Sequence, residues 1–236
     1  MTDQHRMRSV RTPALILKRR DFGEADRLLT ILTPYQGKLD VIAKGARKMI
    51  SSKTGHVELY TRADMLIHRG RELGICVQAE MIAPFLPLRE DLNRGAHASY
   101  CAELLDRLTA EGETDAGALF NLMNDTFIRL SLEDDLRLAV RFFELRLLDL
   151  AGFRPELLSC VVEHEPLLPE DQFFDNASGG VVCPRHALRA IALVSLSVDT
   201  LKLLRHLQRS TWKQVASLKI PPRVHEEAER VMLGYV

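Results

Sequence analysis

The side chains with the clearest potential for chemistry in this sequence are cations that follow a short apolar segment. In Leu39–Lys48, LDVIAKGARK, alternating apolar residues lead into Lys44, Arg47 and Lys48, with Gly45 between them. The alternation predicts a strand with one buried face, and the glycine allows a tight turn at its end. Cations presented in this way bind phosphate backbones, mainly through counterion release. We expect nucleic-acid binding, rather than a merely solvated rim, from Arg19, Arg20, Arg27, Lys38, Lys44, Arg47, Lys48 and Lys53.

The distribution of charge supports a polyanionic partner. The formal net charge is zero, but residues 1–82 hold 15 Lys and Arg against 9 Asp and Glu, a balance of +6. Residues 83–236 hold 17 against 23, a balance of −6. A basic N-terminal third favours a polyanion there, although drift around neutrality is the alternative. Stacking of bases would be sparse, because this third has only Phe22, Tyr35 and Tyr60 as aromatic residues.

A second set of side chains could hold a metal ion. The segment CVVEH places Cys160 and His164 in one loop, and CPRH places Cys183 and His186 in another. Zinc ribbons use two such knuckles, about twenty residues apart, to form a tetrahedral structural site. Here Glu163 stands where the second cysteine of the first knuckle belongs. The sequence therefore predicts one structural zinc on Cys160, His164, Cys183 and His186, or a knuckle that has lost its metal.

A third feature is the pair Arg137 and Arg141, one helical turn apart beside Phe142 and Phe143. Two solvated surface cations are one interpretation. The other is a protein-partner groove that accepts a peptide with acidic residues and an apolar end.

Signals of catalysis are missing from the sequence. It has no phosphate-binding P-loop and no G-x-S-x-G motif. Asp134 and Asp135 stand at an expected helix start, where they favour the helix dipole, and the histidines are dispersed. We expect no catalytic residues and no enzymatic activity.

The elements that must position these side chains divide at about residue 83. Strands are expected at about 12–19, 25–32, 38–44, 56–69 and 73–82, separated by turns. Five short strands must close on themselves or leave exposed edges, and a five-stranded oligonucleotide-binding barrel has this size. From about 89 to 151 the apolar period becomes helical and Gly152 ends the last helix. Residues 188–208 and 223–233 are expected to be helical as well.

The sequence thus predicts an α+β multidomain protein. Its parts are an OB-fold barrel (1–82), the first part of a helical domain (83–154), a loop-rich, zinc-ribbon-like insertion (155–187) and the second part of the helical domain (188–236). No run approaches the eighteen or so apolar residues of a membrane span, and the N-terminus lacks the apolar core of a secretory signal. Four dispersed cysteines without a disulfide framework favour the cytoplasm.

Several segments together resemble the RecO family of bacterial DNA repair proteins. They are ALILKRRDFGEADRLLTILTPYQGKLDVIAKGARK, GRELGICVQAE, LREDLNRGAHASYCAELLDRLTAEGE and RFFELRLLDLAGFRPELLSC, and they lie within residues 12–187. VIAKGAR is close to the family's most recognisable signature.

The resemblance implies more than the residues alone. Members have an OB-fold barrel and a helical domain, often with a four-cysteine zinc ribbon inserted. They bind and anneal single- and double-stranded DNA, and with RecR they help load RecA onto strands coated by single-strand-binding protein. By position, Lys44, Arg47 and Lys48 match the family's basic signature, and Arg141 matches an arginine that holds the tail of single-strand-binding protein. A cytoplasmic, nucleoid-associated location follows from this role.

Other classes of function stay open at this point. An RNA-binding OB-fold module would discriminate RNA by its 2′-hydroxyl groups. A metal-dependent nuclease would need a carboxylate cluster that the sequence lacks. A purely structural scaffold would bind no DNA even at low salt.

Overall fold

The computed structural model describes residues 9–48, 53–68, 70, 73–110, 115–187 and 193–236. The chain forms two compact units, Met1–Asp134 and Asp135–Val236. Among the described residues, the first unit contains a β-barrel, three α-helices and a short 3₁₀ helix, and the second contains the remaining helices with a small sheet. The α+β architecture expected from the sequence is confirmed.

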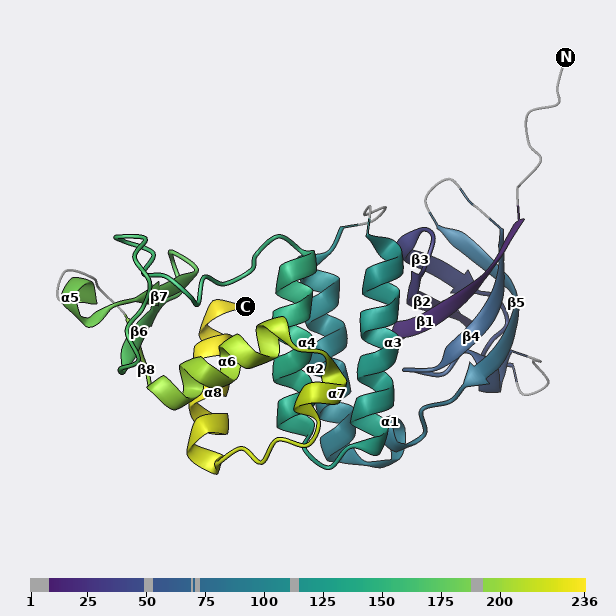
Figure 1. Ribbon diagram of the computed structural model, residues 1–236. Coiled ribbons are helices and arrows are strands. Elements are labelled where there is room, and N and C mark those ends of the chain that lie inside the picture. Colours follow the sequence, from purple (N-terminus) through teal and green to yellow (C-terminus); the bar gives the residue numbers. More distant parts are fainter. Residues whose placement is uncertain (1–8, 49–52, 69, 71–72, 111–114, 188–192) are drawn as a thin grey trace, which may run out of the picture. The chain divides into compact units, whose positions relative to one another are not determined.

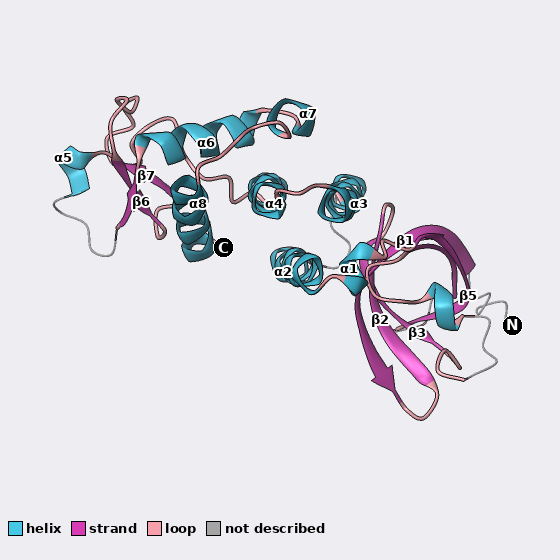
Figure 2. Ribbon diagram, turned by 90° about the horizontal axis from the view of Figure 1, so that it is seen from below, coloured by secondary structure: helices cyan, strands magenta, loops and turns pink. Residues whose placement is uncertain are grey.

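Five strands close into a barrel in the first unit (Figures 1 and 2). They are β1 (Ser9–Phe22), β2 (Asp26–Thr33), β3 (Gly37–Ala43), β4 (Arg62–His68) and β5 (Gly74–Ala83), in the order β1-β2-β3-β5-β4. The 14-residue β1 is long enough to pair with β4 along its first half and with β2 along its second half. A short parallel pairing of β3 with β5 completes the ring. This pairing joins Val41–Ala43 of β3 to Gly74–Cys76 of β5.

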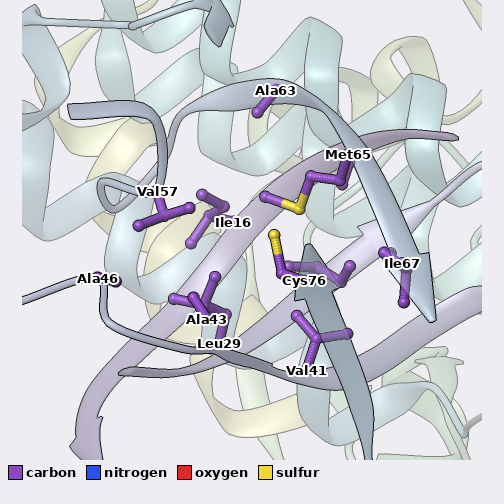
Figure 3. Close-up of a cluster of buried hydrophobic side chains, with 12 residues drawn as sticks. Ile16, Leu29, Val41, Ala43, Ala46, Val57, Ala63, Met65, Ile67 and Cys76 are labelled. Atoms are coloured by element: carbon purple, nitrogen blue, oxygen red, sulfur yellow. The ribbon is translucent and has the colours of Figure 1, made fainter. Parts of the chain in front are cut away.

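Alternate residues of the strands fill the barrel (Figure 3). Ile16, Leu29, Val41 and Met65 have no exposed surface, and Cys76 joins them from β5. The alternation that predicted the strands is therefore the alternation that builds the core.

The fourth strand begins later than predicted. Residues 54–56 form a 3₁₀ helix (η1, Thr54–His56), and β4 starts at Arg62 rather than near 56. Tyr60 takes a left-handed conformation with φ of 60°. Its amide donates to the Ile16 carbonyl at 2.9 Å, and the Ile16 amide donates to the Thr61 carbonyl at 3.0 Å. These bonds to β1 turn the chain before it can join the sheet.

Three helices complete the first unit: α1 (Pro87–Glu90), α2 (Leu92–Leu108) and α3 (Ala116–Leu132). The Asp91 side chain caps α2 by accepting from the amides of Asn93 and Arg94. Arg94 donates to the carbonyls of Leu130 and Glu133 at 2.6 and 2.9 Å, which satisfies the end of α3. The apolar stripe predicted in α2 is buried at Cys101, Leu104 and Leu105 and half-buried at Leu108, and the stripe in α3 is buried at Leu119, Leu122, Met123, Phe127 and Leu130.

The second unit begins with α4 (Leu136–Leu150), which Asp135 caps and after which Gly152 has φ of 79°, as expected. In this unit α4 contacts α6 (Val198–Arg209) and α8 (Pro222–Tyr235). A three-stranded sheet of order β7-β6-β8 is built from β6 (Gln172–Asp175), β7 (Gly180–Val182) and β8 (Val194–Leu196). The short helices are α5 (Pro184–Ala187) and α7 (Trp212–Val215).

The helix predicted over 188–208 needs correction. Residues 188–192 lie outside the described part of the chain, residues 194–196 form β8, and α6 starts only at Val198. Ser197 sets this start because its side chain accepts from the amide of Thr200. None of the helices in the described residues has the length and apolarity needed to cross a membrane.

Candidate nucleic-acid interface and metal cluster

The turn that carries the basic signature is fixed against the β1–β2 hairpin. Gly45, with φ of 69°, donates its amide to Asp26 Oδ1 at 2.7 Å. The Arg47 amide donates to the Ala25 carbonyl at 2.9 Å. Ala46 lies between them with no exposed surface and belongs to the barrel core. One buried alanine and two backbone bonds therefore hold a turn whose neighbouring side chains are cations.

Four of the eight predicted nucleic-acid-binding residues gather at this turn. Lys44, Arg47 and Lys48 are exposed. The Arg47 guanidinium donates to the Gly23 carbonyl at 3.3 Å and lies 3.4 Å from Asp21, an exposed pair that holds it weakly. Lys53 is half-buried and donates to the Lys44 carbonyl at 3.1 Å. We call Lys44, Arg47, Lys48 and Lys53 the basic rim.

Two further predicted residues, Arg19 and Arg27, share one carboxylate. Arg27 Nη1 lies 3.0 Å from Glu58 Oε1, and Arg19 pairs with the other oxygen of the same group. The three side chains are between 16% and 29% exposed. Glu58 therefore offsets part of their charge and joins the 53–61 segment to β1 and β2.

Lys38 connects the barrel to a helix. Its ammonium donates to Asp106 Oδ1 at 2.8 Å and to the carbonyls of Asp106 and Thr109 at 2.7 and 2.8 Å. These carbonyls close the C-terminal end of α2, where a cation is favourable. Lys18 reaches the same carboxylate at 2.6 Å. Burial would raise the pKa of Asp106, but the two lysines outweigh it and lower that pKa.

Arg20, the eighth predicted residue, is exposed on β1 and forms no ion pair within the described parts of the chain. The eight predicted nucleic-acid-binding residues thus fall into two groups with different surroundings. Arg20 and three members of the basic rim are exposed and Lys53 is half-buried, whereas Arg19, Arg27 and Lys38 also hold the barrel unit together. Glu58 and Asp106, which make this division, were missed by sequence reasoning because they lie far along the chain from the cations that they bind.

The two arginines of the predicted partner groove differ in exposure. Arg137 is exposed, and Arg141 is only 5% exposed. Arg141 Nη2 pairs with Glu144 Oε1 at 2.7 Å, one turn further along α4. Its Nε and Nη1 atoms are buried without a hydrogen-bond partner among the described residues. Burying an arginine with unused donors costs free energy, and the single ion pair with Glu144 offsets only part of that cost.

A cluster of metal-ligating side chains lies in the second unit. Ligand atoms of Cys160, Glu163, Cys183 and His186 all lie within 4.8 Å of one another. Cys183 Sγ is 3.2 Å from His186 Nδ1 and 3.3 Å from Glu163 Oε1. Three of the four predicted ligands come together, and Glu163 takes the fourth place instead of His164.

The local backbone explains this difference. The His164 amide donates to the Cys160 carbonyl at 2.8 Å, which closes a tight turn, and His164 is exposed with φ of 61°. Glu163 faces the second knuckle, where Arg185 pairs with it at 3.0 Å. A signal for Glu163 was present in the sequence, because a carboxylate oxygen is itself a zinc ligand.

The donor set fits zinc. In a tetrahedral site the sulfur and nitrogen ligand atoms lie about 3.5 Å apart, close to the separations in this cluster. Zinc is bound by thiolate sulfur. Burial would raise the pKa of Cys160, but backbone N–H groups of Cys183, Glu163 and Val162 outweigh it and lower that pKa. Burial and the hydrogen bond to Glu163 raise the pKa of Cys183, so this second thiol would have to lose its proton on binding the ion. Four protein ligands would make the site structural rather than catalytic.

Comparison with known proteins identifies the family. The family model described as recombination protein O N terminal matches residues 7–85, and recombination protein O C terminal matches residues 89–236. A DNA repair protein RecO from Roseiflexus sp. (strain RS-1) is 38% identical, covering 98% of this chain and 81% of that relative. Relatives of the same name from Alkaliphilus metalliredigens (strain QYMF) and Desulforudis audaxviator (strain MP104C) are 32% and 37% identical. They cover 96% and 90% of this chain, and 92% and 89% of their own lengths are matched. The chain therefore belongs to the RecO family of DNA repair proteins, with a role in DNA repair and recombination.

Proposed function

We propose that this protein is a non-enzymatic mediator of recombinational repair that binds single- and double-stranded DNA through its barrel. The observation that carries the proposal is the basic rim, in which exposed Lys44 and Arg47 flank the buried anchor Ala46. A fixed turn presents its cations without a folding cost at the moment of binding. Such cations contact phosphates, so the binding would depend steeply on salt and little on base sequence.

The strand order and the parallel β3–β5 pairing support an OB-fold assignment for the barrel. The cluster of Cys160, Glu163, Cys183 and His186 supports a structural zinc in a ribbon-like segment. In this proposal the ion would hold the two knuckles together and take no part in DNA chemistry.

The finer activities follow from family membership. We propose that the protein anneals complementary strands and, together with RecR, helps load RecA onto single strands coated by single-strand-binding protein. Arg137 and Arg141 are the proposed contacts for the C-terminal tail of single-strand-binding protein. Because Arg141 is buried beside Glu144, contact with the tail would require the Arg141 side chain to become exposed.

The test is a fluorescence-anisotropy titration of labelled single-stranded and duplex DNA at several salt concentrations. Lys44→Ala combined with Arg47→Ala should weaken binding of both DNA forms. It should also lower the magnitude of the salt slope by about 1.4–1.8, since each lost phosphate contact removes roughly 0.7–0.9. Lys202→Ala combined with Lys213→Ala removes two exposed cations of the other unit and serves as the matched control.

An unchanged salt slope in the Lys44 and Arg47 double variant would remove the basic rim from the proposal. Absence of binding by the wild-type protein at low salt would remove DNA binding altogether. Competition with RNA of the same sequence addresses the alternative of an RNA-binding module, because only RNA offers 2′-hydroxyl groups.

A further inference from the structure

The barrel unit has a cavity of about 650 Å³ in addition to the basic rim. It is lined by outward-facing residues of β1, β2 and β3, by the segment before β4, and by Ser99 and Asp106 of α2. Its apolar wall consists of Leu17, Leu28 and Leu59. This volume and the mixture of apolar and polar walls are typical of a small-molecule site.

Two backbone irregularities meet at the cavity. The pairing of β1 with β2 shifts register between Ile16 and Lys18, so Leu17 is the extra residue of a bulge. Tyr60, another lining residue, has φ of 60°. The two are joined directly, because the Tyr60 amide donates to the Ile16 carbonyl at 2.9 Å. Bulges and left-handed non-glycine residues cost free energy and concentrate at binding sites.

Tyr60 supplies a fixed wall rather than a stacking surface. It is 6% exposed, and its ring packs edge-on against Phe127 with 5.4 Å between the ring centroids. Burial raises the pKa of the Tyr60 hydroxyl, and a hydrogen bond with Ser99 offsets part of this rise. The strained residue thus joins the barrel to α2 across the cavity.

The polar groups of the cavity suit a nucleotide. Lys18, Arg19, Arg20 and Lys38 line it together with two carboxylates, Asp40 and Asp106. Lys18 and Lys38 pair with Asp106 and Arg19 pairs with Glu58, so Arg20 is the lining cation left without an ion pair among the described residues. Lys18, Thr30 and Asp40 form one row across the three strands. In that row Thr30 Oγ1 donates to Asp40 Oδ1 at 2.7 Å. Cations match a phosphate, and a hydroxyl beside a carboxylate matches the donors and acceptors on the edge of a base.

The cavity lies on β3, the strand that leads into the basic rim. Lys44 in the rim follows Asp40 in the cavity by four positions, about 13 Å along an extended strand. Arg20, which is exposed, is the lining residue of β1 nearest in sequence to the β1–β2 turn. One flexible DNA strand can therefore contact both surfaces.

We propose that this cavity receives one nucleotide of a single DNA strand, with its base turned out of the stack against Leu17, Leu28 and Leu59. The proposal rests on the proposed DNA binding and extends it, because it makes the barrel a sensor of unpaired bases. Turning out a base costs least when the base is already unpaired. A duplex would contact the basic rim but would leave the cavity empty.

The test fills the cavity from its helical side. Ser99 is exposed on α2, so Ser99→Trp adds bulk without entering the core. Ser99→Ala removes the hydroxyl and leaves the space open, and Glu90→Trp places the same ring at an exposed position that does not line the cavity. Circular dichroism and thermal melting establish that each variant is folded. Affinity is measured for a single strand and for a duplex by anisotropy, and free dAMP is titrated in parallel.

We expect Ser99→Trp to weaken single-strand binding by about tenfold and to leave duplex binding unchanged, with both controls close to wild type. A 2-aminopurine in the single strand should brighten on binding to the wild type and stay dim with Ser99→Trp. Wild-type affinity of Ser99→Trp for both DNA forms would overturn the proposal, as would equal weakening of both. The wild type could instead bind dAMP saturably and lose this binding in Ser99→Trp, while its affinity for single-stranded DNA stays unchanged. That result would assign the cavity to a free nucleotide. If the cavity proposal fails, Lys44→Ala combined with Arg47→Ala should still weaken DNA binding. If the wild-type protein binds no DNA, both proposals are overturned.

Discussion

At the scale of the residue, the most informative pair is Glu163 and His164. Both follow Cys160 in one loop, and both are chemically able to bind zinc. The turn closed by the His164 amide on the Cys160 carbonyl directs them to different surroundings. Glu163 meets Cys183 and His186, and His164 stays exposed. Backbone geometry, rather than residue type, decides which of the two side chains joins the cluster.

This geometry predicts opposite outcomes for two neighbouring substitutions. Glu163→Ala should weaken zinc retention by about tenfold or more, because it removes one of the four proposed ligands. His164→Ala should retain zinc as the wild type does and is the matched control. The measurement is zinc per chain after dialysis against graded chelator, with cobalt spectra as a second readout of thiolate ligation. Loss of metal in His164→Ala and its retention in Glu163→Ala would contradict the arrangement.

The basic residues show how far sequence reasoning reaches at this scale. The pattern of VIAKGARK is local, so the strand, the turn at Gly45 and the exposed Lys44 could all be predicted. The surroundings of Arg27 and Lys38 could not, because Glu58 and Asp106 reach them only after the barrel closes and α2 docks. Residue type identifies a cation, but tertiary contacts decide how much of its charge is left for a ligand.

At the scale of the element, one carboxylate links two helices of the second unit. Glu227 of α8 accepts from the Ser197 amide at 2.8 Å and from the hydroxyls of Ser197 and Thr200, at the start of α6. Burial would raise the pKa of Glu227, but these hydrogen bonds outweigh it and lower that pKa below its ordinary value of 4.5. The charged form of Glu227 therefore stabilises the folded state.

Glu227→Gln should lower the free energy of unfolding by about 1–3 kcal/mol at neutral pH, since hydrogen bonds to a charged group are lost. A carboxylate whose pKa is lower in the folded state contributes its full stabilisation at pH values above its unfolded-state pKa. That contribution to stability disappears as the pH falls through the folded-state pKa. The difference between wild type and variant should thus shrink below about pH 4.5. Urea unfolding of the wild type and Glu227→Gln, from neutral pH to below about pH 4.5, measures this difference in free energy. Glu226→Gln, at an exposed position of the same helix, is the control. A difference that grows on acidification would refute the role given to the carboxylate.

Elements were predictable where their signal was local. Alternation located the barrel strands, and apolar stripes located α2 and α3, because each signal lies within one segment. The start of β4 and the whole of β8 depend on distant partners. Tyr60 turns because of bonds to Ile16, and Val194–Leu196 is a strand because it pairs with Gln172–Phe174. Such short segments take their conformation from the sheet that they join.

At the scale of the whole molecule, the asymmetry of charge lies within one compact unit. Residues 1–82 have a balance of +6, and residues 83–134 hold 4 Lys and Arg against 10 Asp and Glu, a balance of −6. The first unit, 1–134, is therefore neutral but strongly polar, with a basic barrel and acidic helices. The second unit, 135–236, holds 13 of each and is also neutral. Such a distribution favours one orientation of a polyanion on the first unit.

This distribution predicts that residues 1–134 alone bind DNA with nearly the affinity and salt slope of the full chain, because they contain the closed barrel, the basic rim and the cavity. Residues 135–236 alone should bind at least about tenfold more weakly at low salt, since their charges cancel. Anisotropy titrations of both fragments and the full chain, with folding checked by circular dichroism, make the comparison. Lys44→Ala with Arg47→Ala in the 1–134 fragment should reproduce the loss of slope expected for the whole protein. A folded 1–134 fragment that binds tenfold more weakly than the full chain would mean that the second unit supplies part of the DNA site.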